Sequence, residues 1–258
     1  MKVITLSNQK GGVAKTSTSN ALSAGLYNRG HKVLAVDMDP QCNLSFSCGM
    51  DMLNTEKTLF DVFKGNADVT ETIIPIKLGF DLLPGGLTLA GADMDFTQTG
   101  REYMLSEALE KVSENYDYCI IDTPPTLGVL TVNAMTAADY VIIPTTADIY
   151  AMQGFTQLYA LIQNVRRYCN KGLKIAGILL TRYNDRQIIS KTLKANIGRA
   201  AENLGTEVFK TYIREGVAVR ETQLLQSDLF ADAPKANVTQ DYNNFINELL
   251  ERMGEDGK

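Results

Sequence analysis

The chain has 258 residues, is 45% hydrophobic and 21% charged, and carries a formal net charge of −5. This length and apolar content suit one large α/β domain and argue against wholesale disorder. The negative net charge argues against a protein that coats nucleic acid over its whole surface. No apolar run approaches the roughly 20 residues that a membrane span needs, and the first residues predict a strand rather than a signal peptide.

The expected elements alternate between strands and helices. Short apolar runs predict strands at 2–8, 32–39, 79–86, 116–125, 139–147, 175–183 and 206–213. Apolar residues at helical spacing predict helices at 15–30, 151–169, 187–204 and 237–253, while residues 54–100 are less regular. This order predicts one doubly wound, mostly parallel sheet with helices on both faces. We expect a single domain over residues 1–258, with a frayed acidic tail at 251–258.

The cysteines predict neither a zinc site nor a disulfide framework. Cys42, Cys48, Cys119 and Cys169 form no C-x-x-C pair, and His31 is the one histidine. Free thiols in a reducing compartment are the favoured interpretation.

Residues 8–20, NQKGGVAKTSTSN, join the first strand to the first helix through a glycine-rich turn. Gly11 and Gly12 allow the backbone to curl around an anion, and a helix N-terminus attracts phosphate. Lys15 is placed to reach the β- and γ-phosphates of a nucleotide, and Thr16 to bind Mg²⁺. The alternative is an ordinary glycine turn with solvated lysines.

This loop departs from the usual pattern G-x-x-x-x-G-K-[ST]. Gln9 and Ala14 stand where glycines are expected, and Lys10 is an additional lysine five residues before Lys15. The candidate nucleotide-binding residues are Lys10, Gly11, Gly12, Val13, Ala14, Lys15, Thr16 and Ser17.

Carboxylates follow two other expected strands, namely Asp37 and Asp39 after one and Asp122 after another. The carboxyl ends of parallel strands meet at one edge, where open α/β sheets bind ligands. Thr16, Asp39 and Asp122 are therefore the candidate Mg²⁺ residues. Taken singly, Asp122 could instead cap a helix and Asp39 could belong to a turn before Pro40.

Three stretches carry a family resemblance. KGGVAKTS resembles the deviant Walker A motif of the ParA/MinD superfamily of ATPases, and DMDPQCN resembles the switch I stretch of ParA and Soj partition proteins. Residues 116–144 resemble their Walker B and switch II region. The resemblance covers residues 1 to about 185 and implies a doubly wound P-loop fold, ATP and Mg²⁺ as cofactors, and an ATP-dependent homodimer.

The resemblance also implies roles for single residues. Lys10 would contact the phosphates of the partner subunit, while Lys15 acts within its own chain. Asp39 would position the attacking water, and Asp37 would be a structural neighbour of the metal. The implied catalytic residues are therefore Lys10, Lys15 and Asp39.

Other positions depart from the family. Asp148 and Gln153 are shorter or neutral replacements in a stretch where the family often reads P-V-x-x-E-x-x-A-x-x-G. Arg214 replaces a proline expected near the adenine.

Three functions are compatible with this superfamily. A partition ATPase would be cytoplasmic and nucleoid-associated, bind DNA without sequence preference, and respond to a ParB-like partner; a close variant would position a protein cargo. A MinD-like ATPase would carry a basic amphipathic helix for the membrane, whereas residues 241–258 are acidic, so no membrane is expected. An iron protein would need a bridging cysteine, and Cys119 lies inside an expected strand; an amidoligase lacks a recognisable substrate signature.

DNA binding is favoured by the charge of the second half of the chain. Residues 151–240 hold 13 Lys and Arg against 7 Asp and Glu. Arg186 and Arg220 are the candidate DNA-binding residues, because they fall near basic positions of the family. Scattered solvated charge is the alternative.

Overall fold

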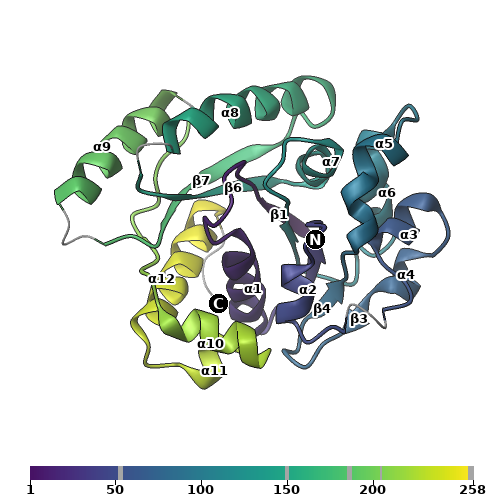
Figure 1. Ribbon diagram of the computed structural model, residues 1–258, viewed down its shortest axis with the longest axis horizontal. Helices are drawn as coiled ribbons and strands as arrows, with labels where there is room; N and C mark the ends of the chain where they lie inside the picture. The colour runs from purple at the N-terminus through teal and green to yellow at the C-terminus, as the bar shows by residue number, and fades with distance from the viewer. Residues whose placement is uncertain (52–54, 149–150, 185–187, 204, 255–258) are drawn as a thin grey trace.

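The computed structural model describes residues 1–51, 55–148, 151–184, 188–203 and 205–254 (Figure 1). Its centre is a seven-stranded sheet in the order β3-β4-β2-β5-β1-β6-β7, in which only the β3–β4 pair is antiparallel. The strands are β1 Lys2–Leu6, β2 Val33–Asp37, β3 Ile74–Pro75, β4 Asp81–Leu83, β5 Tyr118–Asp122, β6 Tyr140–Thr146 and β7 Lys174–Thr181. The predicted doubly wound α/β fold is confirmed.

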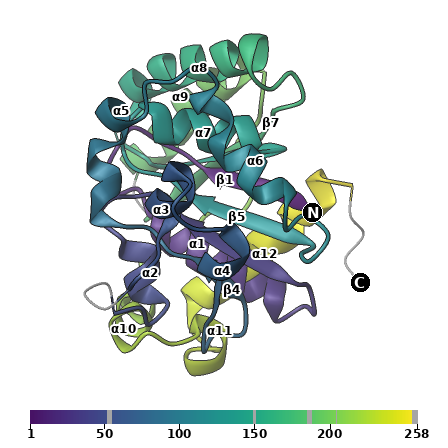
Figure 2. The same cartoon turned by 90° about the vertical axis from the view of Figure 1, so that its right-hand side faces the viewer.

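Helices cover both faces of this sheet (Figures 1 and 2). The α-helices are α1 Lys15–Tyr27, α2 Asn43–Ser47, α3 Leu59–Lys64, α4 Val69–Thr72, α5 Ala92–Asp95, α6 Met104–Glu110, α7 Val129–Ala137, α8 Ala151–Tyr168, α9 Ile188–Asn203, α10 Val217–Leu225, α11 Leu229–Asp232 and α12 Asn237–Arg252. Two short 3₁₀ helices are Leu87–Gly91 and Arg101–Tyr103.

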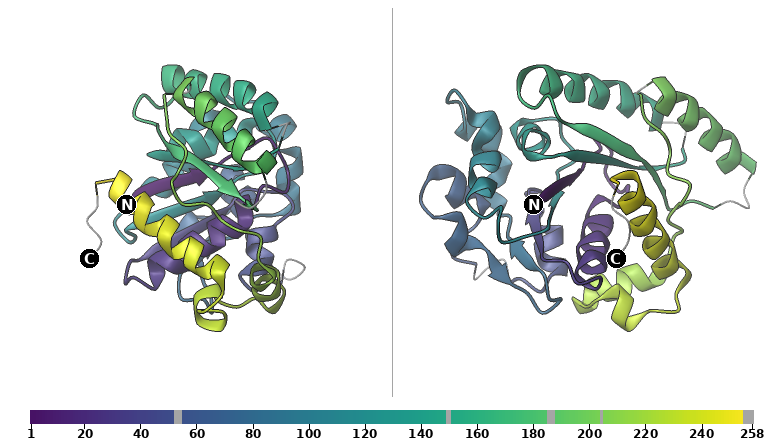
Figure 3. Two further views of the ribbon diagram at one scale, coloured as in Figure 1. Left: turned by 90° about the vertical axis from the view of Figure 1, so that its left-hand side faces the viewer. Right: turned by 180° about the vertical axis from the view of Figure 1, so that it is seen from behind.

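Two separate apolar cores result, one on each face. One core is formed with α3, α6, α7, α8 and α9, and the other with α1, α2, α11 and α12. Figure 3 shows α8 and α9 side by side on one side of the sheet and α12 beside α1 on the other. β2 and β5 are buried along their whole length, as parallel strands covered on both faces must be.

The strand register brings the loop and the carboxylates to one edge. Leu6, the last residue of β1, pairs with Asp122, the last residue of β5, and Asp122 in turn pairs with Asp37, the last residue of β2. The loops that follow these strands therefore begin at the same level, which positions the phosphate loop beside both acidic segments.

The sequence interpretation was wrong at one strand. Residues 206–213 make only isolated bridges to β7, between Ile178 and Val208 and between Thr181 and Ile213. The segment is half-buried and crosses the edge of β7 without forming a regular ladder, so the apolar pattern of a covered loop resembled that of a strand. The short helix α10 was not expected either.

The expected last helix is confirmed. Phe245, Ile246, Leu249 and Leu250 are buried in the core beside α1. Glu251 and Arg252 complete this helix, and Met253 is buried. The frayed tail remains a prediction for residues 255–258, which lie outside the described residues.

All four cysteines are free thiols, and burial raises the pKa of Cys42 to about 12 and the pKa of Cys119 still further. Within the described residues, no helix is long and apolar enough to cross a membrane.

Candidate active site

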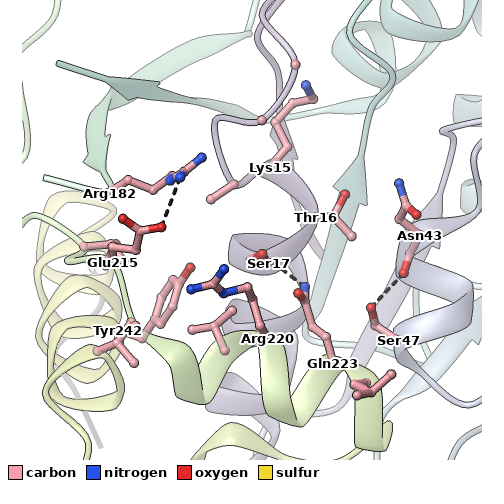
Figure 4. A pocket seen from close by; sticks show the side chains of 18 of the residues that line it. Lys15, Thr16, Ser17, Asn43, Ser47, Arg182, Glu215, Arg220, Gln223 and Tyr242 are labelled. Atoms are coloured by element: carbon pink, nitrogen blue, oxygen red, sulfur yellow. Dashed lines mark hydrogen bonds and ion pairs between the residues drawn. The ribbon is translucent and has the colours of Figure 1, made fainter. Parts of the chain in front are cut away.

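A pocket of about 730 Å³ opens at the carboxyl edge of the sheet (Figure 4). It is lined by the loop after β1, by the segment after β2, by α10 and by one face of α12. Among the predicted site residues, its walls include Gly11, Gly12, Ala14, Lys15, Thr16, Ser17, Asp39 and Arg220. The structure thus brings together residues from three distant parts of the chain.

The loop is shaped by two residues in the left-handed region. Gly12 has φ 73° and Ala14 has φ 59°. A Cβ built on Gly11 or Gly12 would meet no atom within 4 Å, so both glycines face open space where an anion can approach the backbone. Val13 points the other way: its side chain is buried, and its carbonyl accepts a hydrogen bond of 3.0 Å from the Thr181 hydroxyl. The loop is thereby anchored to β7.

Lys15 lies over the loop rather than in solvent. Its ammonium donates to the carbonyls of Asn8 and Lys10 at 3.1 and 3.2 Å. Burial lowers the pKa of Lys15, while the charges of Asp122 and Asp39 act in the opposite direction. This buried cation, held by two backbone carbonyls, is suited to a phosphate ligand that supplies stronger acceptors.

The additional lysine of the loop, Lys10, points away from the cradle. Lys10 lies beside the end of β6, where its ammonium forms an ion pair with Asp148 and a 3.3 Å hydrogen bond to the Thr146 hydroxyl. The side chain of Lys10 is 37% exposed. Lys10 and Lys15 therefore occupy different environments, one at the surface and one in the cradle.

Asp122 is fully buried behind Thr16. Its carboxylate accepts hydrogen bonds from the hydroxyls of Thr16 at 2.6 Å and Ser19 at 3.1 Å. Burial and the nearby charge of Asp37 raise the pKa of Asp122 to about 7. A hydroxyl and a carboxylate held together beside a phosphate loop are the hard oxygen donors that Mg²⁺ takes alongside phosphate and water.

The two acids after β2 have different surroundings. Asp37 is fully buried, and its carboxylate accepts from the Ser45 amide and hydroxyl at 2.8 and 2.7 Å and from the Asp39 amide at 3.1 Å. Burial raises the pKa of Asp37 to about 6. Asp39 lines the pocket, and one of its carboxylate oxygens accepts from the Gln41 amide at 3.0 Å. Asp37 holds the turn, while Asp39 faces the ligand space.

The pocket walls include side-chain pairs that sequence patterns did not identify. Arg182 pairs with Glu215 at 3.0 Å, and Gln223 donates to the Ser17 hydroxyl at 3.0 Å (Figure 4). Arg214, the departure from the family pattern, is paired with Asp241 of α12. These pairs join segments far apart in the chain, so no local pattern could have indicated them.

The structure places one of the two candidate DNA-binding residues. Arg220 is exposed, and it lies on α10 at the wall of the nucleotide pocket rather than remote from it. Figure 4 shows its guanidinium on the same side of α10 as Gln223. Arg186 lies outside the described residues.

The fold and loop define a P-loop nucleotide-binding protein with two lysines in its phosphate loop. Residues 1–175 match a family model described as an AAA domain. The sporulation initiation inhibitor protein Soj of Bacillus subtilis is 36% identical over 250 residues, which cover 96% of this chain and 98% of Soj. The chromosome partitioning protein ParA of Caulobacter vibrioides is 37% identical over 256 residues, covering 98% and 95%. The chain belongs to the ParA/Soj family of partition ATPases.

Solved structures agree with this fold. Cobyrinic acid a,c-diamide synthase from Mycobacterium smegmatis, with a bound ATP analogue and magnesium, superimposes with a TM-score of 0.87. The two sequences are 33% identical, and the match covers 98% of this chain and 96% of that one.

Proposed function

We propose that this protein is a Mg²⁺-dependent ATPase of DNA partition, which dimerises when it binds ATP. The observation that carries the proposal is the separation of the two loop lysines. Lys15 is buried over its own phosphate loop, whereas Lys10 is at the surface beside Asp148. A cation placed at the surface next to a nucleotide pocket can serve the pocket of a second copy, where it stabilises phosphoryl charge much as an arginine finger does.

Within one chain, the phosphate loop binds the nucleotide. The backbone amides of the glycine-rich turn and the N-terminus of α1 would bind the phosphates, and Lys15 would neutralise the β- and γ-phosphate charge. Thr16 and Asp122, whose side chains are hydrogen-bonded to each other, would hold Mg²⁺. When bound, Mg²⁺ supplies charge neutralisation on the phosphate oxygens.

Asp39 positions the water that attacks the γ-phosphate. It is the acid after β2 that lines the pocket, whereas the Asp37 oxygens already accept three hydrogen bonds from the chain. With Thr16 and Asp122, Asp39 is also one of the residues that would hold Mg²⁺. A carboxylate oxygen beside the phosphates that still has an acceptor position for a hydrogen bond can orient a water molecule for in-line attack.

The ATP dimer binds DNA without sequence preference, and a ParB-like partner stimulates hydrolysis. Two copies present twice the Lys and Arg of residues 151–240, and each phosphate contact adds roughly 0.9 to the slope of log affinity against log salt. ATP would therefore switch DNA binding on and place the protein on the nucleoid.

Membrane binding and synthase activity are less well supported. The apolar face of α12, formed by Phe245, Ile246, Leu249 and Leu250, is buried, so it is unavailable for insertion into lipid. Both partition relatives are more similar in sequence than the mycobacterial synthase. A protein cargo in place of DNA would use the same ATPase cycle.

The test is DNA binding by the Asp39→Ala variant, which traps the ATP state. It should bind random duplex DNA at low salt with ATP and not with ADP, and rising salt should weaken binding steeply. Arg220→Ala should weaken binding, whereas Lys77→Ala, which changes an exposed lysine outside the basic half, should not. An ATP dimer that ignores DNA and sediments with anionic liposomes would replace the partition function with a membrane function.

A further inference from the structure

α10 is a wall of the nucleotide pocket that is weakly attached to the rest of the fold. Ala218 and Val219 are its partly buried apolar contacts with the core. Val217, Leu224 and Leu225 are 60%, 75% and 70% exposed. A helix with small apolar anchors has a low local stability and can change its position at little cost.

Within the described residues, one side-chain hydrogen bond joins this helix to the start of α1. The side-chain amide of Gln223 donates to the Ser17 hydroxyl at 3.0 Å (Figure 4). Ser17 lies in the first turn of α1, one residue after Thr16, and lines the pocket. The hydroxyl has one donor and two acceptor positions, so Ser17 can accept from Gln223 and still donate to a phosphate oxygen.

Consecutive hydrogen bonds that pass through one hydroxyl strengthen one another. A phosphate that accepts from the Ser17 hydroxyl polarises its oxygen, which makes that oxygen a better acceptor for Gln223. Arg220 lies one turn before Gln223 on the same helix and lines the same pocket. An occupied phosphate site would therefore hold both side chains, and with them the helix.

We propose that Gln223 is a positioning residue that holds α10 against the phosphate loop through Ser17, so that nucleotide binding fixes the helix that carries Arg220. This inference rests on the proposed nucleotide site and does not depend on DNA binding. The Ser17–Gln223 hydrogen bond would connect nucleotide binding at the phosphate loop to the position of α10 at the surface.

A double-mutant cycle tests the link, with ADP and Mg²⁺ as the probe and calorimetry as the measurement. Gln223→Leu should weaken ADP binding by about 3- to 10-fold, the loss expected for one hydrogen bond. In a Ser17→Ala background the same substitution should have no further effect, because the bridging hydroxyl is absent. Gln240→Leu, which changes an exposed glutamine on α12, is the matched control and should bind ADP as the wild type does.

Amide hydrogen exchange separates this role from a merely structural one. In the wild type, ADP should slow exchange in residues 217–225, whereas in Gln223→Leu it should not. The inference is overturned if Gln223→Leu binds ADP with wild-type affinity, or if its loss is the same in the Ser17→Ala background. Failure of wild-type protein to bind ADP would instead reject the nucleotide site itself, so the two failures are distinguishable.

Discussion

The ammonium of Lys10 and the carboxylate of Asp148 form an ion pair within one chain, at the carboxyl end of β6. In the proposed dimer, Lys10 contacts the phosphates of the other copy. A neighbouring carboxylate in the same chain competes for that ammonium, because both ligands are anionic.

Replacing Lys10 should abolish the ATP dimer and spare nucleotide binding. In an Asp39→Ala background, Lys10→Ala should bind ATP yet remain monomeric, as measured by light scattering after size exclusion. Asp148→Asn should shift dimerisation to lower protein concentration, because the ammonium loses its competing partner. A persistent Lys10→Ala dimer would exclude the role between subunits.

Lys15→Ala should lower the affinity for ADP and Mg²⁺ by about 100-fold or more, since a buried charge-assisted contact to phosphate is worth roughly 3 kcal/mol. Titration calorimetry provides the measurement. Lys171→Ala, an exposed lysine outside the pocket, is the control. Unchanged affinity in Lys15→Ala would mean that the loop is not the phosphate site.

Asp39→Ala should bind ATP and dimerise but hydrolyse it at least about 100-fold more slowly, because only the water-positioning contact is lost. Asp39→Asn keeps the size of the side chain and an acceptor for the Gln41 amide. Asp39→Asn should hydrolyse ATP as slowly as Asp39→Ala, because it lacks the carboxylate charge. Phosphate release under saturating ATP measures both variants. Wild-type turnover in either variant would contradict the role of this carboxylate charge.

The buried acids should make the ligand-free protein less stable as pH rises from 4 to 7. Burial raises the pKa of Asp37 to about 6 and that of Asp122 to about 7, whereas an exposed aspartate titrates near 3.8. In this window the folded state binds more protons than the unfolded state, so these two groups lower the free energy of unfolding as pH increases.

Asp122→Asn should therefore gain roughly 2–3 kcal/mol relative to the wild type between pH 5 and pH 7.5, because over about two of these pH units the folded carboxyl keeps a proton that the unfolded one has lost, at about 1.36 kcal/mol per unit. Urea unfolding at both pH values measures the difference. Asp232→Asn, at an exposed position, should show no such change. Equal effects of Asp122→Asn at the two pH values would contradict the raised pKa.

Ala14→Gly should stabilise the ligand-free protein by roughly 0.5–1 kcal/mol. Ala14 has φ 59° and ψ 32°, a left-handed conformation that costs a residue with a Cβ about 1 kcal/mol or more. Ala160→Gly, the same change at an exposed position inside α8, should instead destabilise by about 1 kcal/mol. Urea unfolding of both variants distinguishes local strain from a general effect of glycine.

Sequence reasoning predicted the elements whose pattern is local. The buried strands ending at Asp37 and Asp122 were recognisable as continuous apolar runs, and the loop from Lys10 to Thr16 as a glycine-rich turn. Residues 206–213 were misassigned because a covered loop has the same apolar content as a strand. The Gln223–Ser17 contact spans 206 residues of chain, so only the folded chain places these two side chains together.

Both borders of the sheet are protected. At one border, β3 contains only Ile74 and Pro75, and proline lacks the N–H that a further strand would need. At the other, residues 206–213 occupy the backbone groups of β7, with Phe209 donating to Ile178 at 2.9 Å and Ile213 to Leu180 at 2.8 Å. Two copies are therefore poorly suited to join by extending the sheet, which lowers the risk of fibrous aggregation at high local concentration. The proposed ATP dimer would instead use the loop edge, where the nucleotide can control its formation.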